Sequence, residues 1–342
     1  MKTELSGQMR GVSLLGGSAI VLRVFSLVAI DAPEAWSASW LSVLLGGLLA
    51  APALLPVLCG RGRAVPGARR MPAAWPGRAA CALLGVMSLC DAAFSARLFA
   101  ALVGYVALTD HSVTALAAPL LACALLACLM GVGALNASAV IWRRAALALA
   151  VLTALLQLRE MEPGWIMPIL GPGWPQIARG ALRAAGLTAH MLLGMYLLAG
   201  DEPGRLAATL PKAIALCAGA VLLFGLLIPA MPDAPASRLF RIELLADSGR
   251  NGFATELIYV LMIFGGTLLV SFELMTAAAA LHAVAPRLPA AACVAMCAAA
   301  LAALAFSGQS GQAQALRATA LFYPMSLAAA ALASVQPKGE AA

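Results

Sequence analysis

Ten apolar segments, each long enough to cross a lipid bilayer, follow one another along the chain. About 20 apolar residues in helical conformation span a hydrocarbon core of roughly 30 Å. None of the segments alternates apolar and polar residues with a period of two, which is the pattern of a membrane β-barrel. We therefore predict an all-α polytopic membrane protein with helices over residues 11–30, 38–59, 80–108, 113–135, 141–158, 177–199, 212–231, 254–284, 287–306 and 314–335.

Composition supports a membrane protein. Of the 342 residues, 63% are hydrophobic and only 11% are charged, and the mean hydropathy is +0.93, whereas a soluble domain needs far more charged surface. The formal net charge of +7 comes from Lys and Arg in short connections, so membrane topology explains it better than nucleic-acid binding. The first segment contains Arg23 and lacks an A-x-A cleavage site, so we expect no cleavable signal peptide.

The distribution of Lys and Arg predicts that both ends of the chain are cytoplasmic. With the N-terminus inside, thirteen of the 22 basic residues fall on the cytoplasmic side and seven outside, while Arg23 and Arg97 lie within helices. The connection 61–78 contains five Arg and no acidic residue, and the first outer connection, with Asp31 and Glu34, contains no basic residue. Short cytoplasmic connections are typically rich in Lys and Arg.

The ten spans divide into two sets of five, residues 1–158 and residues 159–342. Because five is odd, the second set would cross the membrane upside-down relative to the first, as in inverted-repeat transporters. Glycine loosens a helix, and the first and sixth spans both contain glycine-rich positions, so we predict breaks there that open a binding site at the midplane. These positions are Gly16, Gly17 and Ser18 in the first span, and Gly180, Gly186, Leu187 and Thr188 in the sixth. The alternative is that the glycines only permit close helix packing.

Four charged residues lie within predicted spans: Arg23, Asp91, Arg97 and Glu273. A charge near the bilayer centre is costly, so each needs a partner or a function. Counting residues along each helix places all four within a few ångströms of mid-depth. We predict pairing between helices, and Asp91 and Arg97, six residues apart, point to different faces. The charges either neutralise one another or form an ion, proton or substrate site.

Three polar residues add weaker signals. His190 in the sixth span could change protonation state as a switch or be a hydrogen-bonded packing residue. Thr267 and Ser271 stand four residues apart on one face of the eighth span. They could coordinate an ion or simply donate to their own helix backbone.

No constellation of residues predicts an enzyme. The chain contains no P-loop and no Ser/His/Asp grouping. Its eight Cys lie in or beside apolar segments, without a CxxC and without a His at a metal-ligand spacing, so we interpret them as small apolar fillers. We expect no catalytic residues, no metal and no cofactor.

Four motifs, in order, resemble those of the spore-germination permeases, the GerAB-type B subunits of germinant receptors. Residues 31–36 (DAPEAW) and 40–48 (WLSVLLGGL) resemble that family's second helix. Residues 131–143 resemble the junction between its fourth and fifth helices, residues 168–175 the approach to its sixth, and Arg250 the entry to its eighth. The resemblance covers nearly the whole chain.

This resemblance implies a fold of the amino acid–polyamine–organocation superfamily, LeuT-like, with two inverted five-helix repeats. It implies a small-molecule ligand, usually an amino acid, between the first and sixth helices. It also implies a complex with A-type and C-type receptor subunits in the inner membrane of an endospore. One departure is notable: the family commonly has an acidic residue in helix six, where this chain has Ala189 and His190.

Three functions remain open from the sequence. The first is a permease-like receptor subunit that binds a nutrient to trigger germination; the second is an ion-coupled amino acid transporter; the third is a scaffold with a degenerate site. For the first two we predict that the ligand carboxylate meets backbone N–H groups near Gly16–Ser18 and Gly186–Thr188. Its amino group would meet backbone carbonyls or an acid, with Asp91 and Glu273 as the candidates.

The predicted topology can be tested with reporter fusions. Green fluorescent protein fused after residue 342 or before residue 1 is expected to fluoresce, because both ends are cytoplasmic. Alkaline phosphatase fused after residue 110, in a predicted outer connection, is expected to be active. A phosphatase that is active at the C-terminus would mean an odd number of spans and would contradict the two-repeat interpretation.

Overall fold

The computed structural model describes residues 15–24, 26, 38–59, 75–106, 111–156, 173–199, 211–222, 252–307 and 311–334. Ten helices make up this described part. Two are short, Leu15–Val24 and Pro211–Leu222. The others are α2 (Ser39–Cys59), α3 (Trp75–Val106), α4 (Val113–Met130), α5 (Val132–Leu156), α6 (Trp174–Ala199), α9 (Gly252–Val284), α10 (Ala290–Phe306) and α11 (Gly311–Ser334).

The all-helical architecture confirms the predicted fold class, with one described helix for each predicted span. By length and composition, four of the described helices can cross a membrane, namely α3, α4, α6 and α9. Both α3, with 32 residues, and α9, with 33, exceed the roughly 20 residues that a bilayer core requires. Helices of this length tilt or extend beyond the hydrocarbon layer.

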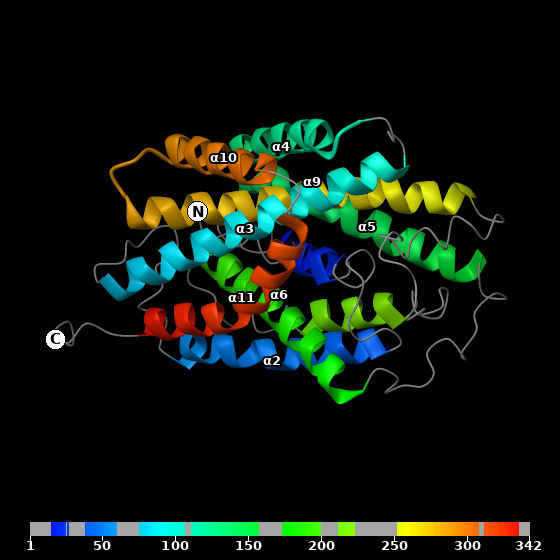
Figure 1. Cartoon of the computed structure of the whole chain (residues 1–342), viewed down its shortest axis with the longest axis horizontal. Helices are drawn as coiled ribbons and strands as arrows, with labels where there is room; N and C mark the ends of the chain where they lie inside the picture. Colours follow the sequence, from blue (N-terminus) through cyan, green and yellow to red (C-terminus); the bar gives the residue numbers. More distant parts are fainter. Residues whose placement is uncertain are drawn as a thin grey trace.

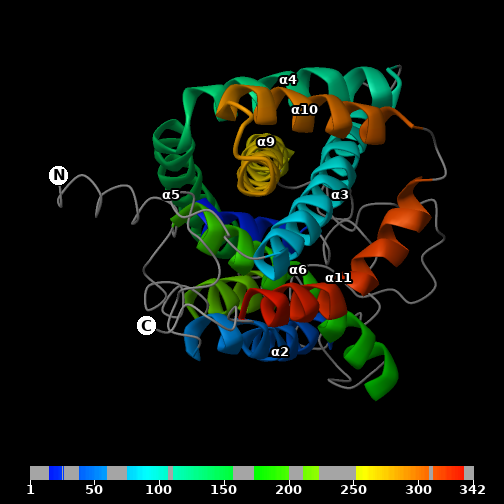
Figure 2. The ribbon, with the colours of Figure 1, turned by 90° about the vertical axis from the view of Figure 1, so that its left-hand side faces the viewer.

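The helices form two groups on either side of α3 and α9. Figure 1 shows α3 and α9 side by side through the middle, with α4 and α10 on one side and α2, α6 and α11 on the other. Figure 2 shows α9 nearly end-on between these groups. Side-chain burial follows this arrangement, because 83% of the apolar window of α6 is buried against 22% of that of α4. In a membrane, α4 therefore faces lipid and α6 lies in the interior.

Helices at equivalent positions in the first and second sets of five make equivalent contacts with the opposite set. Helix α5 packs against α9, and α11, five helices later, packs against α3. Helix α2 packs against α6, and the Cys217 thiol of helix Pro211–Leu222 lies 3.9 Å from the Val21 carbonyl oxygen of helix Leu15–Val24, to which it donates. Two related halves would produce this exchange, and the division after residue 158 stays a prediction.

The boundary between the fourth and fifth spans differs from the predicted one. We predicted helices over 113–135 and 141–158, but α4 ends at Met130 and α5 begins at Val132. Gly131 separates them with a φ of 89°, a left-handed conformation that suits glycine, and its N–H donates to the Cys128 carbonyl oxygen. One glycine is thus enough to reverse the chain.

The predicted helix breaks are wrong for the positions we named. Residues 16–18 are helical, and α6 runs unbroken through residues 180 and 186–188. Glycine serves close packing there instead: a Cβ on Gly186 would lie 2.7 Å from the Tyr323 backbone nitrogen, and a Cβ on Gly16 would overlap the Met195 side chain. The alternative left open by the sequence, close packing, is the one observed.

Close packing at Gly186 leads to a prediction. The variant Gly186→Ala is expected to lose about 1–3 kcal/mol, because its methyl group meets the backbone of α11, which cannot move aside as a flexible side chain can. The matched control is Gly219→Ala, since a Cβ at Gly219 meets nothing within 4 Å and is expected to be neutral or slightly stabilising. Thermal unfolding of the purified proteins in detergent compares them. Equal melting temperatures for both variants would contradict the close contact.

Candidate functional site

Four ionisable side chains from four different helices meet in the interior. Arg23 comes from helix Leu15–Val24, Asp91 from α3, His190 from α6 and Glu273 from α9. Each of the four is 0% exposed. We call these four residues the ionic cluster.

Arg23 and Asp91 form the best-defined pair of the cluster. The Arg23 Nε donates to both carboxylate oxygens of Asp91, at 2.9 Å and 3.1 Å. The guanidinium carbon lies 4.7 Å from the centre of the Phe94 ring, one turn beyond Asp91 on α3, which adds a cation–π contact. Arg23 is therefore held from two sides by α3.

His190 connects the two acidic residues. Its Nε2 lies 3.2 Å from Glu273 Oε1 and 3.8 Å from Asp91 Oδ2, and its Nδ1 lies 3.2 Å from the Gly186 carbonyl oxygen. Its ring packs edge-on against Phe322 of α11, with 5.1 Å between the ring centres. The imidazole is thus fixed by its own helix, by α9 and by α11.

These distances determine how many protons the cluster holds. A carbonyl oxygen only accepts, so Nδ1 must carry a hydrogen to bond with Gly186. Nε2 faces carboxylate oxygens, so a second proton lies between Nε2 and Glu273 Oε1, on one atom or the other. With that proton in place, the charges of the four groups cancel. A neutral cluster can be buried at a much lower free energy than one with an unpaired charge.

Several polar atoms at the cluster have no hydrogen-bond partner within the described part of the chain. They include both terminal nitrogens of Arg23, Nη1 and Nη2, and the second carboxylate oxygen of Glu273, Oε2. The fully buried hydroxyl of Ser88 is also unpartnered and lies near Glu273, outside hydrogen-bond geometry. Buried polar atoms normally find partners, so such a group of exceptions indicates room for a ligand, an ion or water.

Two glycines position His190 between neighbouring helices. Gly186 and Gly194 lie one turn before and one turn after it on α6. A Cβ on Gly194 would lie 2.8 Å from Thr276 Cγ2 of α9, while Gly186 touches α11. Small residues on both sides of the histidine thus allow α9 to bring Glu273 within reach of its ring.

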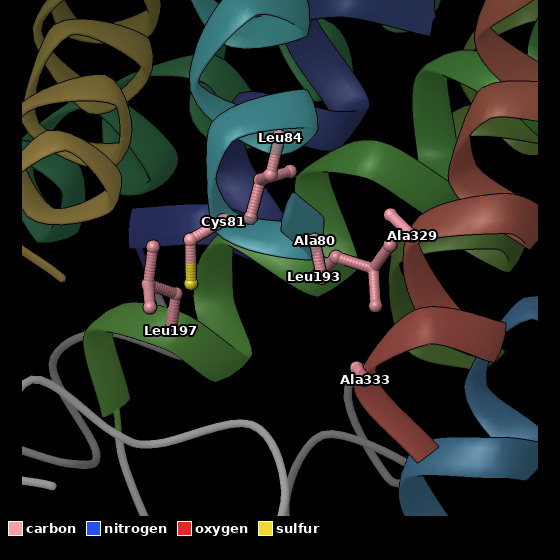
Figure 3. Close-up of a pocket in the computed structure, with 7 residues that line it drawn as sticks. All are labelled: Ala80, Cys81, Leu84, Leu193, Leu197, Ala329 and Ala333. Carbon is pink, nitrogen blue, oxygen red and sulfur yellow. The ribbon is translucent and has the colours of Figure 1, made fainter. Parts of the chain in front are cut away.

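An apolar recess lies beside the cluster. Figure 3 shows side chains of α3, α6 and α11 around it, and its cavity volume is about 20 Å³, which is close to the size of one water molecule. It is lined by Ala80, Cys81, Leu84, Leu193, Leu197, Ala329 and Ala333. Leu84 precedes Asp91 by about two turns of α3, and Leu193 follows His190 by about one turn of α6. In the described conformation the recess is too small for a nutrient, and none of the four cluster residues lines it.

The sequence-predicted residues fall into two groups. Arg23, Asp91, His190 and Glu273 come together, which confirms pairing between helices. Arg97 is a half-buried residue further along α3.

The remaining candidates are buried or half-buried residues of the described helices, and their role in ligand or ion binding stays a prediction. Thr267 donates to the Ile263 carbonyl oxygen and Ser271 to the Thr267 carbonyl oxygen, so both bond back to α9. Leu187 packs against Met87 and Phe322. Ser18 and Thr188 are buried, and Gly17 is half-buried.

Sequence reasoning missed Ser88, Phe94 and Phe322 as neighbours of the cluster. Ser88, Asp91 and Ser95 share a face of α3 at helical spacing, and this polar stripe in an apolar helix was a usable signal. No comparable signal marks Phe322, because its contact with His190 depends on how α11 packs against α6.

Comparison with known proteins identifies the family. Residues 9–199, more than half of the chain, match the family model described as spore germination protein. The chain belongs to the spore germination protein family. Among curated proteins, none matches it significantly.

A solved structure shows the fold of this spore germination family member. The chain is similar to Mhp1, a nucleobase-cation-symport-1 family transporter solved in a closed conformation with bromovinylhydantoin bound. The two align with a TM-score of 0.55 at 17% identity, over 92% of this chain and 75% of the transporter. The protein is thus a multi-pass membrane protein of a permease family, with a LeuT-like transporter fold and no enzymatic role. The motif residues 31–36, 168–172 and Arg250 lie outside the described residues, whereas the junction motif 131–143 begins at Gly131, between α4 and α5, and otherwise lies within α5.

Charge balance in the cluster predicts that a second substitution can restore stability lost through a first one. Arg23→Gln is expected to destabilise the spore germination protein by about 3–5 kcal/mol, because it leaves two buried carboxylates without a permanent cation. Adding Asp91→Asn to Arg23→Gln is expected to restore much of this loss, since the remaining carboxylate can pair with protonated His190. Melting temperature and yield in detergent measure both. A double variant no more stable than Arg23→Gln alone would contradict the charge-balance argument.

Proposed function

We propose that this protein binds a small zwitterionic nutrient, most simply an amino acid, at the ionic cluster and acts as the permease-like subunit of a germinant receptor. The observation that carries the proposal is the pair of unpartnered groups at the two ends of the cluster. Arg23 Nη1 and Nη2 offer donors to a carboxylate, and Glu273 Oε2 offers an acceptor to an ammonium group. Within the described residues these atoms have no other protein partner.

The chemistry of an amino acid matches this arrangement. A guanidinium donates two parallel hydrogen bonds to a carboxylate, which is a geometrically specific form of recognition. An ammonium group placed near Glu273 and Asp91 gains charge-assisted hydrogen bonds in a site without bulk water. This assignment replaces our expectation that backbone N–H groups of broken helices bind the carboxylate, because α6 is unbroken at residues 186–188. It also gives a reason why helix six can lack the acidic residue that the family commonly has there, since Glu273 of α9 supplies an acid beside His190.

A ligand can reach the cluster only after the helices separate, because all four residues are 0% exposed. Opening between α6 and the neighbouring α3 and α11 would widen the apolar recess into an entry route. Binding then shifts the equilibrium between open and closed arrangements of the helices, to the extent that the ligand binds one better. In a receptor, this shift would be passed to A-type and C-type subunits in the endospore inner membrane, with both chain ends facing the spore interior.

The second candidate function is an ion-coupled amino acid transporter. The specific observation that favours it is the proton held between His190 and Glu273, since a proton bound beside a substrate site is a basis for coupling. Uptake of labelled amino acid into proteoliposomes separates the two functions. Accumulation driven by a proton gradient would favour transport, whereas binding without accumulation would favour the receptor.

Ligand binding is testable by thermal stabilisation of the purified protein against each of the twenty amino acids. A ligand at 100 times its Kd is expected to add about 2.7 kcal/mol to the free energy of unfolding. Glu273→Gln, which removes the acceptor charge with little change of shape, is expected to abolish this shift. The control is Ser42→Ala, which removes a buried hydroxyl of α2 that donates to the Ile177 carbonyl oxygen and is not part of the ionic cluster. No stabilisation of the wild type by any amino acid would overturn the proposal and favour a scaffold with a degenerate site.

A further inference from the structure

We propose that Asp91, His190 and Glu273 also form a seat for a divalent transition-metal ion. The three side chains come from α3, α6 and α9, and their nearest donor atoms all lie within 4.8 Å of one another. The His190 Nε2 lies 3.2 Å from Glu273 Oε1 and 3.8 Å from Asp91 Oδ2. An ion placed about 2.1 Å from each donor needs separations of roughly 3–4 Å, so only small side-chain movements would be required.

The orientation of His190 suits a metal ligand. Its Nδ1 lies 3.2 Å from the Gly186 carbonyl oxygen, which leaves Nε2 facing both carboxylates. Metal-ligating histidines almost always donate their other ring N–H to a carbonyl or carboxylate in this way, because it fixes both tautomer and ring orientation. Arg23 orients Asp91 in a similar way without being a ligand itself, since its Nε donates to both carboxylate oxygens and holds them in place.

Unpartnered buried oxygens provide an independent indication of a ligand. Glu273 Oε2 and the Ser88 hydroxyl are both fully buried, and neither has a partner at good hydrogen-bond geometry in the described structure, although Ser88 lies close enough to the Glu273 side chain to interact with it. A metal ion between the three donors would give these oxygens a partner, directly or through a bound water. Ser95, one turn beyond Asp91 on the same helix, is equally buried and its hydroxyl is also unpartnered, so it provides a comparison matched for both properties.

The charge balance allows a cation. With His190 neutral, two carboxylates face one permanent cation, Arg23, so the cluster is short of one positive charge. A divalent ion takes the place of the proton shared by His190 and Glu273 and exceeds this deficit by one charge. A hydroxide or a carboxylate at an open coordination position cancels the excess, and a site with three protein ligands has such a position.

The donor set indicates which ions fit. One imidazole nitrogen and two carboxylate oxygens suit Mn²⁺, Fe²⁺, Co²⁺ and Zn²⁺, while thiolates would select softer ions. The inference of a metal seat is independent of nutrient binding, although an ammonium group and a metal ion would compete for Glu273. Measuring metal binding without nutrient therefore distinguishes failure of this inference from failure of the proposed function.

The test uses Mn²⁺ and the full-length protein purified in detergent. Mn²⁺ prefers oxygen and nitrogen donors, so the eight cysteines of the chain interfere less than they would with Zn²⁺ or Co²⁺. The loss of the electron paramagnetic resonance signal of free Mn²⁺ gives the amount bound, after an incubation long enough for the closed cluster to open. We expect one Mn²⁺ per chain in the wild type.

Variants assign the bound ion to the seat. His190→Gln and Glu273→Gln are each expected to weaken Mn²⁺ binding by at least about tenfold, since loss of an outer-shell partner alone often has that effect. His282→Gln, which alters a half-buried histidine of α9 whose Nδ1 lies 3.0 Å from the Leu288 carbonyl oxygen, is the control and is expected to bind as the wild type does. Ser88→Ala is expected to weaken binding more than Ser95→Ala.

Two outcomes would overturn the inference. The first is a wild-type protein that retains no Mn²⁺, which would mean that a proton alone occupies the position. The second is binding that is unchanged in Glu273→Gln, provided that the variant melts as cooperatively as the wild type, because the ion would then be elsewhere. If His190→Gln does not fold, the Glu273→Gln and Ser88→Ala comparisons still decide the question.

Discussion

The cancellation of charge between Arg23, Asp91, His190 and Glu273 is the constraint on which the rest of the structure depends. A single unpaired charge at the centre of a membrane helix costs about 2.5–3.5 kcal/mol even on the most lenient scale. Four ionisable groups can be buried together only when their helices hold them at hydrogen-bond distances. Helix Leu15–Val24, α3, α6 and α9 must therefore meet at one point, and the outer helices pack around that meeting point.

Glycine makes this meeting sterically possible. Gly186 and Gly194 bring α11 and α9 against α6 on either side of His190, so that the ring reaches Glu273. The same residues lower the intrinsic stability of α6, because glycine is a poor helix former. The helix stays continuous since its neighbours surround it and 83% of its apolar window is buried. A glycine in a helix can thus either allow close packing or loosen the backbone, and the contacts with neighbouring helices decide which of the two occurs.

This explains what the sequence could and could not predict. The spans were predictable because the thickness of a bilayer fixes their length, and each described helix lies at a predicted span. The turn at Gly131 was missed because a single glycine in a left-handed conformation replaced a longer connection. Counting residues along each helix correctly placed Arg23, Asp91 and Glu273 at similar depths, but it gives no information on how each helix is rotated about its axis. The partnership of Arg23 with Asp91, and of His190 with Glu273, therefore required the structure.

A closed ionic cluster also constrains which ligands can act on the protein. To open the helices, a ligand must compensate for contacts that the cluster loses, and only differential affinity for the open arrangement can supply this. An apolar molecule could fill the recess beside Leu84 and Leu193 but could not satisfy Arg23 or Glu273. A molecule with separate positive and negative ends satisfies both, because each end meets an unpartnered group of opposite charge. Discrimination among nutrients would then arise from the unpaired charges that a wrong ligand leaves behind, which is the stronger form of specificity in a buried polar site.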